Sequence, residues 1–296
     1  VGQRRSQQAA AHQCWYAAGY VLAAGRASGL TPMCRQWAGG HGGETYSPKG
    51  LSMTLIGTKS TSSPTATENT TTRDPRTFWR VGLALALPIG PLLVTIARAM
   101  MPYWTSQDDT TIAANIAAHP KTMELMTWIG LPVLPFMLIT VLGLGYVARR
   151  GAPVLAAVAT IPAFFAYAMW NSAGPSDYLG WVMSTHGYSV DQMVTLSRQL
   201  GDTASATFVG LFWVAVHILG MVIAAIALRR ARILPLWAAI LLGLSQPVHL
   251  VAAIIVPSRW LDVFGGWGMT TLICGYVALQ VMRMRNEDWD LPRLPA

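Results

Sequence analysis

Two long apolar runs in the C-terminal half constrain this chain more than any other feature. They are Ala206–Leu228 and Ile233–Val256, and neither contains an aspartate, glutamate, lysine or arginine. The basic turn Arg229–Arg232 joins them. About 20 helical residues, at about 1.5 Å rise per residue, cross the roughly 30 Å hydrocarbon core of a bilayer. The pair therefore predicts a hairpin of two transmembrane helices.

The composition agrees with lipid as the main solvent of the chain. Of its 296 residues, 53% are hydrophobic and only 11% are charged, whereas about a quarter of a soluble domain is charged. The net charge of +8 does not indicate nucleic-acid binding, because the arginines lie at the ends of apolar runs rather than on one continuous face. The expected partners are the lipid bilayer and other membrane subunits.

Four further apolar runs complete the predicted fold, an all-α polytopic bundle of six transmembrane helices over residues 78–285. They are Phe78–Met101, Leu125–Val147, Pro153–Trp170 and Phe264–Met282. The long connections between runs are expected to hold two short extracytoplasmic helices, Thr110–Ala118 and Ser189–Leu200. Ser189 is a suitable N-cap for the second, and Gly201 a suitable stop.

The distribution of basic residues predicts the orientation. One side of the bundle would hold Arg73, Arg76, Arg80, Arg149, Arg150, Arg229, Arg230, Arg232, Arg283, Arg285 and Arg293, and the other only Lys121, Arg198 and Arg259 in its loops. Basic residues concentrate on the cytoplasmic side. We therefore expect both termini in the cytoplasm and, from the arginine-rich, lysine-poor composition, a bacterial inner membrane. Arg98, near the outer end of the first helix, is expected to extend to the interface.

The terminal segments are expected to lie outside the bundle. The Lys49–Ser52 segment precedes Met53 at a spacing typical of a translated ribosome-binding site, which predicts that residues 1–52 are a non-native, disordered upstream extension. Residues 53–77 are rich in serine and threonine and predict a disordered cytoplasmic tail. Residues 286–296 are interpreted as a cytoplasmic C-terminal tail.

The runs contain no motif of a known catalytic or metal centre. No acidic residue, lysine or interior arginine is expected within the spans, which disfavours a conventional ion-driven pump because such pumps need a titratable relay. No nucleophile motif, phosphate-binding loop or zinc spacing occurs. The sequence therefore predicts no catalytic residue and no metal, and does not favour an enzyme.

A small set of polar residues at membrane depth is the candidate site. Ser245–His249 is the most polar stretch, and Pro247 within it frees a backbone acceptor. Intramembrane polar residues are functional candidates by default. The predicted outward-facing pocket is lined by His217, Gln246, His249, Tyr167 and Asn171.

Three classes of function remain open. The first is binding, sensing or transport of a small molecule through this pocket. The second is a b-type haem redox protein, with His217 and His249 as ligands; the third is an accessory or scaffold subunit without a ligand. Counted along the two apolar runs from their shared turn, the histidines differ in depth by roughly 8 Å, which argues against one haem between them. No cofactor is therefore predicted, and haem b stays an alternative.

Overall fold

Helices and the turns between them account for the part of the chain that the computed structural model describes, residues 74–170 and 177–290, and no strand occurs there. The predictions for residues 1–52, for most of the tail 53–77, for Asn171 and for the end of the C-terminal tail lie outside the described residues. All of the described residues belong to one compact unit.

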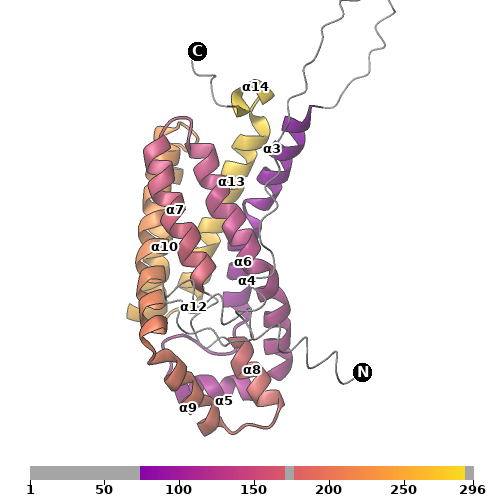
Figure 1. Cartoon of the computed structure of the whole chain (residues 1–296), viewed down its shortest axis with the longest axis vertical. Helices are drawn as coiled ribbons and strands as arrows, with labels where there is room; N and C mark the ends of the chain where they lie inside the picture. Colours follow the sequence, from indigo (N-terminus) through magenta and orange to yellow (C-terminus); the bar gives the residue numbers. More distant parts are fainter. Residues whose placement is uncertain (1–73, 171–176, 291–296) are drawn as a thin grey trace, which may run out of the picture. The chain divides into compact units, whose positions relative to one another are not determined.

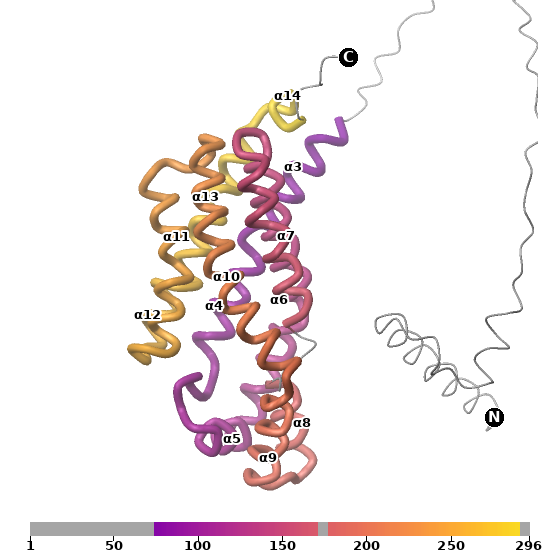
Figure 2. Tube along the Cα trace, turned by 60° about the vertical axis from the view of Figure 1, so that its left-hand side comes forward, coloured from indigo at the N-terminus to yellow at the C-terminus, as the bar shows by residue number. Residues whose placement is uncertain are grey.

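Seven of the described helices run along the bundle, and α4 continues α3 in the same direction (Figures 1 and 2). They are α3 (Pro75–Ala86), α4 (Ile89–Met100), α6 (Pro120–Ala148), α7 (Pro153–Trp170), α10 (Ala204–Arg230), α11 (Leu236–Leu250) and α13 (Met269–Arg283). Two π-helical turns, η2 (Val251–Ile255) and η3 (Asp262–Gly268), extend α11 and precede α13, and α12 (Arg259–Leu261) lies between them. The other α-helices of the described chain are α5 (Asp109–Ala118), α8 (Asp177–Thr185), α9 (Val190–Gly201) and α14 (Asn286–Trp289).

Five helices of the described chain are long and apolar enough to cross a membrane. They are Pro75–Met100, Pro120–Ala148, Pro153–Trp170, Ala204–Arg230 and Leu236–Ile255. The sixth predicted span, Phe264–Met282, is divided between η3 and α13 and is not among these five. An all-helical fold of the described residues, with five candidate membrane-spanning helices, is therefore confirmed, and the count of six stays a prediction.

The helices form a closed ring. Contacts run from α4 to α6, then to α7, α10, α11 and η3–α13, and return to α3–α4. The outer surface of this ring carries large exposed apolar side chains, such as Leu211 (69% exposed) and Leu272 (73% exposed). Exposed apolar side chains on most of the helices of the ring agree with lipid around it.

Short turns close one end of the ring, the arginine-rich end, which also holds the start of α3 and α14 (Figure 1). A Cβ atom at Gly151 would lie 2.4 Å from the Cα atom of Ala231, so the α6–α7 and α10–α11 turns meet backbone to backbone. The C-terminal tail predicted from Asn286 begins instead with α14, whose Trp289 is buried against Tyr146.

Helices α5, α8 and α9 pack together at the opposite end, which we call the cap (Figure 2). Asp108 caps α5 by accepting a hydrogen bond from Thr111 N, and Ser189 caps α9 with a capping box that includes Gln192. Their buried apolar side chains form a separate core. The sequence predicted two short helices in this region. The described chain has a third, α8, which was not predicted.

Candidate functional site

A buried chain of ionisable side chains lies in the interior of the ring near the cap. The Arg98 Nε atom lies 2.6 Å from Asp262 Oδ2, and the His249 Nδ1 atom lies 2.5 Å from Asp262 Oδ1. Asp262 is fully buried, and the other two residues are less than 10% exposed. We call these three residues the charged triad.

The triad corrects one prediction and adds one residue. Arg98 was expected to extend to the interface, and Asp262, which lies just before the predicted sixth span, was not among the candidate site residues. Arg98 instead turns inward, because Asp262 neutralises it and the Trp104 ring lies 4.3 Å from its guanidinium carbon. Asp262 was missed because the predicted sixth span began at Phe264, whereas the helical backbone already includes residue 262.

Helix ends favour the charges at these positions. Arg98 lies in the last turn of α4, where the helix dipole is negative, and Asp262 lies in the first turn of η3, where it is positive. Gly266 permits the close approach of η3 to α11. A Cβ atom there would lie 3.2 Å from His249 Cα and 2.7 Å from Asp262 Oδ1.

The two intramembrane histidines converge. The ring centroids of His217 and His249 are 5.8 Å apart, so the argument from unequal depth was wrong. The depth was counted from the ends of the apolar runs rather than from the ends of the helices. His217 precedes the end of α10, Arg230, by as many residues as His249 follows the start of α11, Leu236, and the helical rise then puts the two side chains level.

Both imidazoles are anchored through Nδ1. His217 Nδ1 lies 2.7 Å from the carbonyl oxygen of Trp213 and His249 Nδ1 contacts the Asp262 carboxylate. A carbonyl oxygen only accepts, so His217 Nδ1 carries the proton, and in the neutral ring Nε2 offers a lone pair. His217 Nε2 is buried and has no hydrogen-bond partner within the described residues.

Two aromatic side chains beside His217 also hold polar atoms without partners. Trp213 stacks on His217, with ring centroids 3.9 Å apart, and Tyr167 from α7 lies edge-on to Trp213. Within the described ranges, Tyr167 Oη and Trp213 Nε1 are buried without a hydrogen bond. A cavity of about 20 Å³ borders Tyr167, His217 and Gly220, enough for about one water molecule.

Gln246 faces another side of the interior. Its Nε2 atom donates to Thr270 Oγ1 at 2.8 Å, and the Thr270 hydroxyl donates in turn to Ser245 Oγ at 2.9 Å. This buried chain joins α11 to α13, and Gln246 Oε1 has no hydrogen-bond partner in the described part of the molecule. Gln246 therefore lies next to the triad in sequence but bonds toward α13.

The predicted site residues thus have three different surroundings. Tyr167 and His217 line one cavity, His249 belongs to the triad, and Gln246 links helices; Asn171 lies outside the described residues. Residues 74–170 and 177–290 contain no group of three metal-ligating side chains from His, Cys, Asp or Glu. The arrangement supplies a fixed Asp–His pair, a second imidazole and several unpaired hydrogen-bonding atoms.

The comparisons with known proteins add no function to this geometry. The chain matches no protein-family model, no curated protein and no solved structure.

Proposed function

We propose that the protein is a six-span membrane protein that binds or transports a small polar molecule at the centre of its helical ring. The observation that carries this proposal is the group of unpaired polar atoms on Tyr167, Trp213 and His217. Leaving a buried donor or acceptor unpaired costs about 1–3 kcal/mol, and three on adjacent side chains are most simply accounted for by a molecule that pairs with them.

The chemistry of these atoms defines the ligand class. Trp213 Nε1 can only donate, His217 Nε2 accepts in the neutral ring, and the Tyr167 hydroxyl does either. A neutral molecule that carries both a donor and an acceptor, such as an amide, an alcohol or a protonated carboxylic acid, satisfies all three. The adjacent cavity of about 20 Å³ admits little more than water, so binding such a molecule requires the helices to separate.

The triad would supply the coupling to protons. Asp262 and His249 share a short hydrogen bond beside His217, and buried carboxylate–histidine pairs are typical proton relays in membrane transporters. The distribution of arginines supports the cytoplasmic location of the arginine-rich end in a bacterial inner membrane, with the cap outside. The central site would then open toward the cap, as an outward-facing pocket.

A thermal-unfolding screen of the purified protein in detergent tests this proposal. Formamide, acetamide, glycerol and acetic acid would serve as probes, and a ligand at 100 times its dissociation constant stabilises the folded state by about 2.7 kcal/mol. We expect at least one probe to raise the melting temperature of the wild type but not of His217→Phe. Equal responses of the two proteins to all probes would contradict the proposal.

Haem binding is the second candidate. The level position of the two histidines favours it, but the adjacent cavity of about 20 Å³ would have to open to admit a porphyrin. Both rings are held through Nδ1, by a carbonyl and by a carboxylate, which is how proteins orient imidazole ligands of metals. His217 Nε2 and the corresponding atom of His249 would hold the iron. A Soret band in the purified protein that disappears in His249→Ala would favour this candidate over the first.

A further inference from the structure

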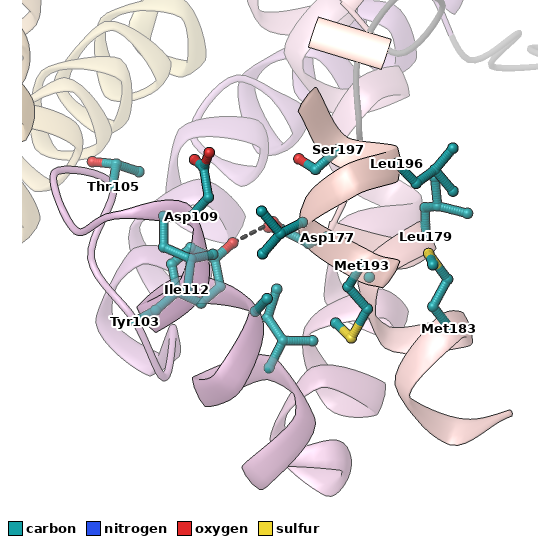
Figure 3. Close-up of a pocket in the computed structure, with 14 residues that line it drawn as sticks. Tyr103, Thr105, Asp109, Ile112, Asp177, Leu179, Met183, Met193, Leu196 and Ser197 are labelled. Carbon is teal, nitrogen blue, oxygen red and sulfur yellow. Dashed lines mark hydrogen bonds between the residues drawn. The ribbon is translucent and has the colours of Figure 1, made fainter. Parts of the chain in front are cut away.

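A second cavity lies in the cap, apart from the central site. Its volume is about 240 Å³, slightly below the range of about 300–1,000 Å³ typical of small-molecule pockets. Its walls come from α5, α8, α9 and the segment after α4 (Figure 3). One part of the wall is apolar and includes Ile116, Met183 and Met193.

A carboxylate and a phenol face this cavity together. The Tyr103 hydroxyl donates to Asp177 Oδ1, as the dashed line in Figure 3 marks. Tyr103 is 5% exposed, whereas Asp177 begins α8 at the accessible edge of the cavity. One phenol satisfies only part of the acceptor capacity of a carboxylate, which has about four lone-pair sites.

The second carboxylate in the wall is already neutralised. Asp109 Oδ2 lies 2.8 Å from Arg198 Nε. No salt bridge reaches Asp177 among the described residues. The cavity therefore offers one carboxylate that forms no salt bridge within the described residues. It lies next to a wall of thioether and aliphatic groups that adapt to varied apolar shapes.

We propose that the cap cavity binds a small amphipathic amine, with its ammonium group on Asp177 and its apolar body against Met183, Met193 and Ile116. An anionic ligand would meet the carboxylate without compensation, and a purely apolar one would leave it unpaired. Burial raises the pKa of the Asp177 carboxyl, while Tyr103 and Arg98 oppose that rise; a bound ammonium would hold the carboxyl ionised.

Calorimetric titration of the full chain in lipid nanodiscs tests this proposal, with empty nanodiscs as the blank. Phenethylamine is the cationic probe and 2-phenylethanol its neutral counterpart. Because a hydrogen bond to a charged group contributes about 1.5–3 kcal/mol, Asp177→Asn should weaken amine binding about ten- to a hundredfold. Asp202→Asn, which removes an exposed carboxylate at the end of α9, is the matched control and should leave it unchanged.

Two further variants separate the possible failures. Gly180→Val fills the cavity from α8, because a Cβ atom there already lies 3.3 Å from Ile116 Cδ1, and should abolish binding of both probes without altering charge. His217→Phe should leave amine binding intact, so that failure of the central site and failure of the cap site are distinguishable. No saturable amine binding, equal affinity for the alcohol, or unchanged binding in Asp177→Asn would overturn the proposal.

Discussion

Replacing either Arg98 or Asp262 alone should destabilise the bundle far more than replacing both of them. Asp262→Leu leaves the Arg98 guanidinium buried beside Trp104 with no carboxylate, and Arg98→Met leaves Asp262 with only His249. Breaking a buried ion pair from one side costs about 3–5 kcal/mol, whereas replacing both partners by apolar groups of similar volume is often neutral or stabilising by about 1–4 kcal/mol.

The expected outcome is a large coupling energy. Each single variant should lower the free energy of unfolding by about 3–5 kcal/mol, and the double variant should lose less than either single variant. The coupling energy is then at least about 3 kcal/mol, the upper end of the range of about 0.5–3 kcal/mol seen for contacting residues. Equilibrium unfolding in mixed micelles with increasing sodium dodecyl sulfate measures these values. Additive losses in the double variant would refute the ion pair between α4 and η3.

The remaining predictions concern close backbone approaches and the cap. Gly266→Ala should lower the unfolding free energy by about 1–3 kcal/mol in the same assay, because the added methyl group meets His249 and Asp262; Gly275→Ala, with open space around it, should not. Gly151→Ala should cost a similar amount by separating the two turns at the arginine-rich end, and an unchanged midpoint would show that those turns do not touch. The raised pKa of Asp177 means that its contribution to cap stability is complete below its ordinary pKa of about 3.9 and is lost as the pH rises through the raised value. Hydrogen exchange of α8 amides should therefore quicken with rising pH beyond the intrinsic rate in the wild type, and less so in Asp177→Asn.

The transmembrane helices could be predicted from the sequence because few backbone conformations are stable in lipid. A run of about 20 apolar residues must satisfy its backbone hydrogen bonds internally, so it forms a helix wherever it lies. Helix α8 was missed because its apolar residues, in Asp177–Thr185, are too few for a clear period.

The candidate site could be predicted only in part. Polarity at membrane depth identified His217 and His249, which do converge. Asp262 was missed because it lies just before an apolar run, and a charged residue at that position is predicted to belong to a loop. The available signal was Arg98, a lone cation inside an apolar run, since such a charge needs a buried partner of opposite sign. Which carboxylate meets it depends on the tertiary arrangement of α4 and η3.

The tautomers of the two central histidines test the central claim most directly. Nitrogen-15 NMR of histidine-labelled protein in lipid nanodiscs, with resonances assigned through His217→Phe and His249→Phe, reports which ring nitrogen carries the proton. The structure predicts a protonated Nδ1 on both rings and, for neutral His217, an unprotonated Nε2. A His217 ring protonated on Nε2 alone, or free exchange of both rings with bulk water, would contradict a buried site built around these two imidazoles.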